Sequence, residues 1–226
     1  MTARRRRAGL VCLLVLLGCA GMAWVEGVLQ PIYPVKSAAK AALFSGLVLA
    51  YCLLTGDRTP LRTFSRCGKT ALRPALWCAG LVLIGILGGY AVIGRYLDLS
   101  AIPDNLAAKE GITAAVFPYA AAYITLCNSL LEELFFRGFA FLTLKNVMDG
   151  PFPWLFSAGL FALYHLSITD GWAQPLLLAG MVAGLTLGGL FFNFLDRDGS
   201  LWPGWIVHMA ANLAINTIAL HLFGVF

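Results

Sequence analysis

The chain has 226 residues, of which 60% are apolar and 12% are charged, and its formal net charge is +5. A soluble domain carries roughly 25% charged residues, so the composition excludes an ordinary soluble protein. The basic residues gather at the ends of apolar segments, which indicates membrane topology rather than nucleic-acid binding. The six cysteines contain no CxxC pair, so they predict neither a disulfide framework nor a thiolate zinc site.

We therefore predict an all-α polytopic membrane protein, a single membrane domain with about seven or eight transmembrane helices around a central hydrophilic cavity. The apolar segments are 8–25, 38–55, 75–93, 119–144, 152–168, 175–195 and 201–222. The apolar region 112–144 exceeds the about 20 residues that one crossing needs. Whether this region contains an eighth span therefore stays open.

Charge patterning predicts the orientation of the chain. Arg4–Arg7 precede the first apolar run, as in a signal peptide. The run continues through Met22 and Trp24, so we expect a retained first span with a cytoplasmic N-terminus. A second basic stretch, between residues 57 and 74, predicts a cytoplasmic loop; it contains Arg58, Arg62, Arg66, Lys69 and Arg73.

Two adjacent carboxylates and an arginine lie inside the apolar run 119–144. An ionisable group in a membrane span costs about 2.5–3.5 kcal/mol and indicates a functional site. Glu133 and Arg137 stand four residues apart and can pair on a helix. Glu132 is rotated about 100° from Glu133. We therefore expect Glu133 to be a structural counter-ion, and Glu132 to lack a salt partner and be free for chemistry.

Four polar side chains from three segments are expected at one depth. With a rise of about 1.5 Å per residue, Glu132 lies about 18 Å, and His165 about 18–20 Å, from the ends of their helices on the same side. His208 and Asn212 lie roughly 12 and 18 Å into the last span. Because they are four apart on one face, His208 and Asn212 can point at one substrate oxygen. Phe161, four residues before His165, gives that histidine an aromatic wall.

Glycines recur at every fourth position in the segment 175–195, at Gly180, Gly184 and Gly188. Such a small-xxx-small stripe lets helices approach closely. We expect it to serve helix packing rather than substrate contact.

Three short motifs occur in order on successive membrane segments: Glu132-Glu133-x-x-x-Arg137, Phe161-x-x-x-His165 and His208-x-x-x-Asn212. As an ordered set they resemble the CPBP intramembrane proteases, which include CAAX-processing, Rce1-type enzymes and bacterial bacteriocin-processing or immunity (Abi) relatives. The lead-in Gly199–Pro203 is also similar. The resemblance places a catalytic core in residues 111–226, whereas residues 1–110 match only as three N-terminal spans with their loops.

The resemblance implies how the motif residues would work. Glu132 and His165 would orient and activate a water molecule. His208 and Asn212 would stabilise the oxyanion, and each such donor is worth about 2.7–4 kcal/mol in kcat. The other motif residues would support the site: Glu133, Arg137 and Phe161.

Two other chemistries stay open for this site. Ser129 and Cys127 lie near Glu132, but a serine nucleophile needs its own base within hydrogen-bond distance, so we favour direct attack by water. Glu132, His165 and His208 could also supply three zinc ligands with water as the fourth. The chain has no HExxH pairing, and we favour a metal-free site without a cofactor, with zinc as the alternative.

We expect an intramembrane glutamic-type endopeptidase that hydrolyses a peptide bond of a membrane protein or peptide, in the inner membrane of a bacterium. Its partners would be that substrate and the lipid bilayer, with no nucleic acid. One alternative is a non-catalytic scaffold or bacteriocin-immunity protein that binds a peptide in the same cavity. Another is a proton-coupled transporter. A sorting tail, a bacteriocin leader and a CaaX-type tail all stay open as substrates, as does the oligomeric state.

Overall fold

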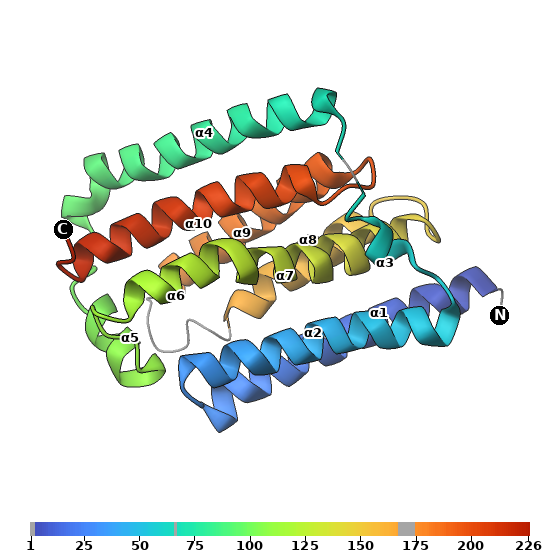
Figure 1. The fold of residues 1–226 in the computed structure, drawn as a ribbon, viewed down its shortest axis with the longest axis horizontal. Helices are drawn as coiled ribbons and strands as arrows, with labels where there is room; N and C mark the ends of the chain where they lie inside the picture. The colour runs from blue at the N-terminus through green and yellow to red at the C-terminus, as the bar shows by residue number, and fades with distance from the viewer. Residues whose placement is uncertain (1–2, 66, 167–174) are drawn as a thin grey trace.

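The computed structural model describes residues 3–65, 67–166 and 175–226, with the side chains of residues 175–177 left out. Arg66 of the predicted basic loop, and the last residues of the predicted span 152–168, lie outside these ranges. In chain order the helices are α1 (Ala3–Trp24), η1 (Val25–Leu29), α2 (Tyr33–Thr55), α3 (Thr59–Arg62), α4 (Lys69–Ile93), η2 (Gly94–Tyr96), α5 (Ile102–Glu110), α6 (Phe117–Tyr123), η3 (Ile124–Asn128), α7 (Ser129–Glu132), η4 (Glu133–Thr143), α8 (Phe152–Leu166), α9 (Pro175–Asp196) and α10 (Trp202–Leu222) (Figure 1). Of these, η1, η3 and η4 are π-helical, and η2 is a 3₁₀ turn.

Within the described residues, all regular structure is helical, and the prediction of an all-α polytopic membrane protein is confirmed. Within the described part of the chain, five segments are long and apolar enough to cross a bilayer: Ala3–Leu29, Tyr33–Thr55, Lys69–Tyr96, Leu178–Asp196 and Trp202–Leu222. The helix α8 is apolar but shorter. The two chain ends lie at opposite ends of the bundle (Figure 1).

One uninterrupted helix runs through the middle of the bundle as α6, η3, α7 and η4. The residues at its internal junctions, Tyr123, Asn128 and Glu132, all keep right-handed helical backbone angles. The helix begins at Phe117, with Pro118 in its first turn, where a missing N–H does no harm. The apolar region 112–144 therefore forms one helix rather than two.

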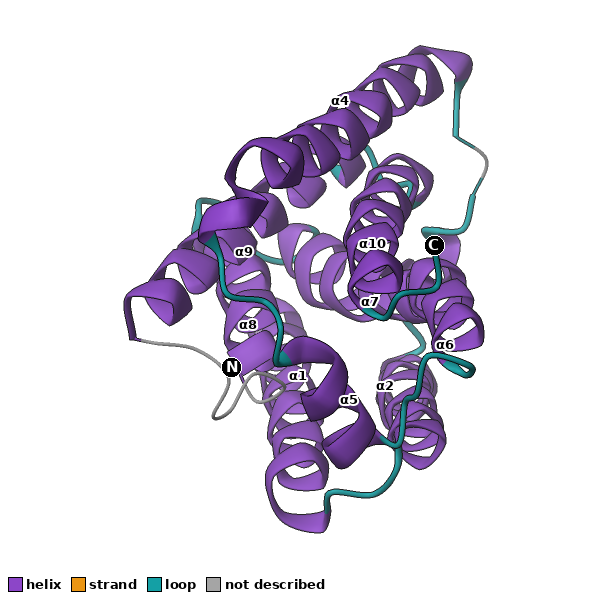
Figure 2. Ribbon diagram, turned by 90° about the vertical axis from the view of Figure 1, so that its left-hand side faces the viewer, coloured by secondary structure: helices purple, strands orange, loops and turns teal. Residues whose placement is uncertain are grey.

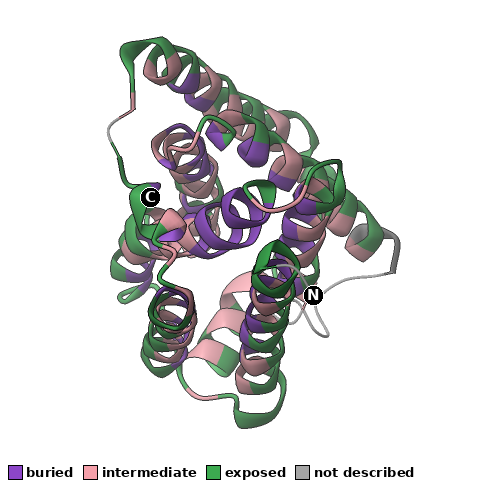
Figure 3. Cartoon of the chain, turned by 90° about the vertical axis from the view of Figure 1, so that its right-hand side faces the viewer, coloured by how far each residue is buried: buried purple, intermediate pink, exposed green. Residues whose placement is uncertain are grey.

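The core of the protein lies along this central helix, where the buried residues gather (Figure 3). Phe135, Phe136 and Phe139 are completely buried. The ring of Phe44 on α2 stacks on Phe135 with centroids 3.8 Å apart, and Tyr51 packs against Phe139 at 5.1 Å. Such aromatic pairs add to the energy of burial, so α2 is fixed against the central helix.

The hairpin of α1 and α2 approaches the central helix closely because α1 has a glycine at the contact. A Cβ atom on Gly18 would lie only 2.5 Å from the ring of Phe135. A larger residue at this position would push the hairpin away from the central helix. The close approach brings Lys40 of α2 to the carboxylate of Glu132 on α7.

The helix α4 lies at the edge of the bundle and packs mainly along α10 (Figure 2). In the most apolar stretch of Lys69–Tyr96, no residue is buried inside the protein. Although α2 and α4 are both apolar spans, only α2 reaches the middle of the protein.

The predicted glycine stripe on α9 does not mediate helix packing. Among the residues that the structure describes, no atom lies within 4 Å of a Cβ built on Gly180, Gly184 or Gly188. The close contact occurs one residue later, because a Cβ on Gly189 would lie 3.0 Å from the backbone of Ala158 on α8. The prediction was wrong because glycines on the lipid-facing side of a helix can recur at every fourth position, just as glycines at a helix interface do.

The segment between α2 and α4 folds onto the bundle. Asp57 accepts hydrogen bonds from Thr59 N (2.9 Å) and from the Tyr51 hydroxyl (2.9 Å). The backbone of Leu201 at the start of α10 donates to Thr63 O (3.0 Å). This segment, the N-terminus, the start of α8 and the turn between α9 and α10 all lie at one end of the bundle (Figure 1).

Candidate functional site

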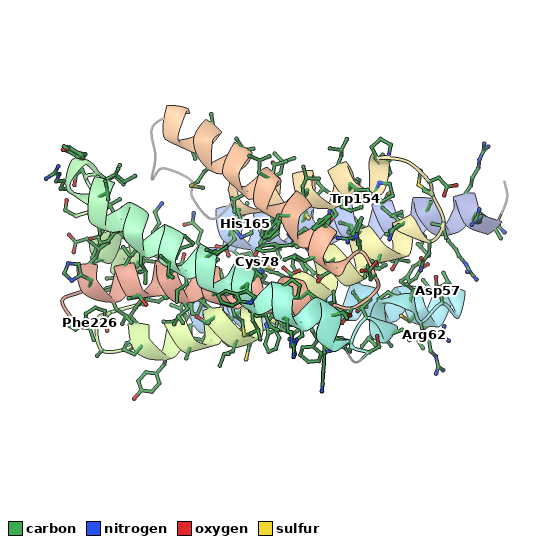
Figure 4. All side chains as sticks on the ribbon, turned by 90° about the horizontal axis from the view of Figure 1, so that it is seen from above. Asp57, Arg62, Cys78, Trp154, His165 and Phe226 are labelled. Carbon is green, nitrogen blue, oxygen red and sulfur yellow. The ribbon has the colours of Figure 1, made fainter. Side chains whose placement is uncertain are left out.

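A cavity of about 360 Å³ reaches the centre of the bundle. All four residues predicted to be catalytic line it: Glu132, His165, His208 and Asn212. Its remaining wall comes from α8, α10, six further elements and the loop before α6, through Met22, Glu26, Tyr33, Lys36, Ser37, Lys40, Leu106, Glu110, Ile112, Phe117, Ile124, Asn128, Tyr164 and Ile215. Figure 4 places His165 between the end of the molecule with Asp57 and Arg62 and the end with Phe226.

The carboxylate of Glu132 lies beside two imidazoles from two other helices. Its Oε2 atom is 3.6 Å from Nε2 of His208 and 4.0 Å from Nε2 of His165. The Glu132 residue is only 2% exposed. The helical rise predicted that these three side chains would share one depth, and the structure brings them together.

The second nitrogen of each imidazole is already hydrogen-bonded, which fixes its orientation. His165 Nδ1 lies 2.7 Å from Phe161 O, and His208 Nδ1 lies 2.7 Å from Glu133 Oε1. A carbonyl or carboxylate oxygen can only accept, so Nδ1 is the donor in both rings. The Nε2 atom of each ring therefore faces Glu132.

Glu132 has a salt partner, contrary to the prediction. Its Oε1 atom accepts from the ammonium of Lys40 and from Asn128 Nδ2 (3.1 Å). Lys40 also donates to Asn128 Oδ1 (2.6 Å) and is 5% exposed. The three motifs do not include this lysine because Lys40 lies on α2, far from the motifs in sequence. Its position inside an apolar span was the signal that could have revealed it.

Glu133 and Arg137 form the predicted pair on η4. Arg137 Nε lies 3.4 Å from Glu133 Oε2, and both side chains are completely buried. The Arg137 guanidinium also lies over the rings of Phe161 (4.1 Å) and Phe192 (4.9 Å). Phe161 thus contacts both this ion pair and His165, whose ring centroid is 4.6 Å from its own.

A third carboxylate, missed by the sequence analysis, extends this pair. Asp196 stands in a polar turn in the sequence, but in the structure it ends α9 and is completely buried. It interacts electrostatically with Glu133 and Arg137. Its Oδ1 accepts from Gly204 N (2.7 Å), one turn before His208 on α10. We call Glu133, Arg137 and Asp196 the buried ion cluster.

Asn212 follows His208 by four residues on α10, and both line the cavity. One N–H of its amide donates to Ile124 O (3.2 Å), which leaves the second N–H for a ligand. Ser129 is engaged elsewhere: its hydroxyl donates to Thr125 O (2.5 Å) and accepts from Trp205 Nε1 (3.0 Å). Ser129 is thus not poised as a nucleophile.

The arrangement disfavours zinc. The imidazoles present Nε2 with Nδ1 hydrogen-bonded, as zinc-binding histidines do. However, over residues 3–65, 67–166 and 175–226, no three His, Cys, Asp or Glu side chains are arranged to hold a metal ion. The ammonium of Lys40 also holds Glu132, and its positive charge repels a divalent cation there.

Comparison with known proteins finds one family model that matches the polar helices. Residues 114–214 match the family model "Type II CAAX prenyl endopeptidase Rce1-like". No curated protein and no solved structure matches the chain significantly. The matched residues contain all three motifs, while α1, α2 and α4 lie outside them. Over residues 114–214 the match confirms the resemblance to the CPBP family of intramembrane proteases that the motifs predict.

Proposed function

We propose that the protein is an intramembrane endopeptidase that hydrolyses a peptide bond with a water molecule activated by Glu132 and His165. The observation that carries the proposal is the meeting of Glu132 Oε2 with Nε2 of His165 and His208 in a buried cavity. The volume of about 360 Å³ is within the range of about 300–1,000 Å³ that is typical of ligand pockets.

In this proposal the water lies between Glu132 Oε2 and His165 Nε2. The 4.0 Å between these atoms allows one water to donate a hydrogen bond to each. As the water oxygen bonds to the substrate carbonyl carbon, the Glu132 carboxylate takes one proton. The same proton then passes to the amine nitrogen as the carbon–nitrogen bond breaks, so that a carboxylic acid and an amine leave.

The developing oxyanion would be held by His208 and Asn212. Because Nδ1 of His208 donates to Glu133, the ring can donate from Nε2 only as an imidazolium. The carboxylates of Glu132 and Glu133 on either side balance its charge. Donors that already point at the place where negative charge develops contribute most of the rate acceleration in such sites.

The orientation of the chain suggests where the substrate enters. We propose a bacterial inner membrane, with the N-terminus and the basic segments at the cytoplasmic end of the bundle. The cavity wall includes η1, the start of α2 and α5, which lie at the opposite end of the bundle (Figure 1). A segment presented from the non-cytoplasmic side, such as the tail or leader of an exported protein, would fit this geometry.

The proposal is tested by comparing the membrane proteins of cells that carry the wild type or the Glu132→Ala variant. We expect at least one protein to keep its uncleaved tail or leader in the variant, and to lose it when the wild-type chain is restored. The Cys127→Ala variant is the control, because Cys127 is exposed and does not line the cavity. Identical peptide termini in Glu132→Ala and wild-type cells would instead support a non-catalytic scaffold that binds a peptide in the cavity.

A further inference from the structure

The cavity contains a buried cation that the motifs do not include. Lys40 is 5% exposed, and lysine is almost never so buried unless it is paired. We propose that Lys40 is a positioning residue of the hydrolytic site, which holds one oxygen of the Glu132 carboxylate and leaves the other facing the two imidazoles. The inference rests on the proposed function, because it assumes that Glu132 acts on water.

The two oxygens of Glu132 have separate partners. Oε1 receives the ammonium of Lys40 and the amide of Asn128. Oε2 faces only Nε2 of His208 and His165 among the contacts described for it. With two donors on Oε1, the carboxylate cannot rotate freely, so Oε2 stays where a water would lie.

The surroundings of Lys40 keep its ammonium in place. Its nitrogen lies 4.9 Å from the ring centroid of Tyr164 and 5.7 Å from that of Phe44. A cation over an aromatic ring is stabilised by about 0.5–2 kcal/mol, depending on desolvation. Phe44 in turn stacks on Phe135 of the central helix. The lysine is therefore held by the same contacts that dock α2.

Charge balance also favours this role. A carboxylate buried without a partner in an apolar medium is strongly disfavoured and tends to take up a proton. Lys40 supplies the opposite charge at the carboxylate itself, which keeps Glu132 available as a base. Arg137 cannot do so, because its guanidinium pairs with Glu133.

A second lysine on α2 provides a matched control. Lys36 lies four residues before Lys40 and is equally buried, at 5% exposed. Its ammonium pairs with Glu26 (2.8 Å) and Glu110 (2.7 Å), which also line the cavity. It thus ties α2 to η1 and α5 rather than to Glu132. Loss of Lys36 tests what removing any buried ion-paired lysine from α2 does to the protein.

The consequence is that the N-terminal helices complete the site. Lys40 lies outside residues 114–214, which match the family model. The matched residues alone would hold the acid, the two histidines and the amide, but not the cation that orients the acid.

The experiment measures hydrolysis by the full-length protein in detergent, on a peptide that spans the bond identified by the membrane comparison. We expect Lys40→Met to lower kcat about 100-fold, the loss that a misplacement of about 1 Å can cause, with KM within about threefold. Lys40→Arg should recover about tenfold of that loss, because it restores the charge. Lys145→Met, at an exposed lysine that does not line the cavity, should keep kcat within about threefold.

A spectroscopic measurement on the same variants needs no substrate. The chain has three histidines, so nitrogen-15 labelling of histidine gives few signals. Lys40→Met should shift the ring signals of His165 and His208 but not those of His221, which does not line the cavity. Lys36→Met should shift neither of the two site signals. If Lys40→Met does not fold, Lys40→Gln takes its place with the same thresholds.

A kcat within about threefold of wild type in Lys40→Met, or unshifted site signals, would overturn the inference. Failure of the proposed function has a different signature, because Glu132→Gln would then also keep its activity. An inactive Glu132→Gln beside a fully active Lys40→Met would overturn the role of Lys40 alone.

Discussion

Glu132 and Glu133 are neighbours in the chain but belong to two different regions of the molecule. Glu132 faces the cavity, where it meets Lys40 and the two imidazoles. Glu133 faces the buried ion cluster and does not line the cavity. A rotation of about 100° per residue along the helix separates the two environments. Adjacent acids on one helix can therefore lie in separate environments, one facing the cavity and the other facing the buried ion cluster.

The two regions meet at His208. Its Nδ1 donates to Glu133 Oε1, while its Nε2 faces Glu132 Oε2. The buried ion cluster therefore orients the ring of His208, which lines the cavity. Variants in the cluster should mainly change stability, and variants in the cavity should mainly change the rate.

The largest effect on stability is expected from Arg137→Met. Removing one member of a buried ion pair typically costs about 3–5 kcal/mol, because the other charge is left without a partner. Glu133 and Asp196 would then face each other in an apolar interior. Thermal unfolding in detergent should show a large decrease in the unfolding temperature. The double variant Arg137→Met/Glu133→Gln should recover part of it, and an unchanged unfolding temperature in the single variant would contradict a structural role for the cluster.

A slightly smaller effect, on rate rather than stability, is expected from Asn212→Ala. Loss of one oxyanion donor lowers kcat about 100- to 1,000-fold, and steady-state kinetics on purified protein would measure it. The matched control is Asn216→Ala, one turn later, whose amide donates to Ala121 O (3.2 Å) and Thr125 Oγ1 (3.0 Å). Asn216→Ala should lower the unfolding temperature and keep kcat. Equal kcat losses in the two variants would show that Asn212 has no special part in catalysis.

Gly204→Ala should lower the stability of the protein through the buried ion cluster, but by less than Arg137→Met does. A Cβ atom at this position would lie 2.5 Å from Asp196 Oδ2, so the carboxylate must move from its hydrogen bond to Gly204 N. Overpacking of this kind costs about 1–3 kcal/mol, and denaturation curves in detergent would measure the loss. Gly184→Ala on α9 is the control, since its new Cβ would meet nothing within 4 Å. Similar curves for both variants would mean that the contact between α9 and α10 is loose.

Metal removal should have no effect on the cavity. In the proposed mechanism Glu132 and His165 activate the water without a metal ion, so we expect the hydrolysis rate of the purified protein to stay the same after extended incubation with a strong chelator. A loss of activity that added zinc reverses would show instead that Glu132, His165 and His208 act as metal ligands.

Two features of the site could be predicted from the sequence by helix geometry alone. The spacing of Glu133 and Arg137 predicted their pairing, and the rise per residue predicted a common depth for Glu132, His165 and His208. Both follow from the regular α-helix, and the π-helical turns of the central helix did not disturb them. The helical membrane fold followed from composition in the same way.

Contacts between distant segments could not be predicted in this way. The pairing of Lys40 with Glu132 depends on how α2 docks, which is decided by Gly18 and by the stacking of Phe44. The polar neighbours of Asp196 in the sequence are typical of a turn, although its own side chain is buried in the structure. Periodicity does not say which face of a membrane helix meets protein and which meets lipid, because both can be apolar.

The most direct test of the central claim is the hydrolysis rate of purified Glu132→Gln on the identified substrate peptide, beside its unfolding temperature. Glutamine keeps the shape of the side chain and an acceptor for Lys40 but cannot take a proton from water. We predict a rate about 100- to 10,000-fold below wild type, the range expected for loss of a general base, with the fold intact. A folded Glu132→Gln variant that cleaves within about threefold of the wild-type rate would contradict the account.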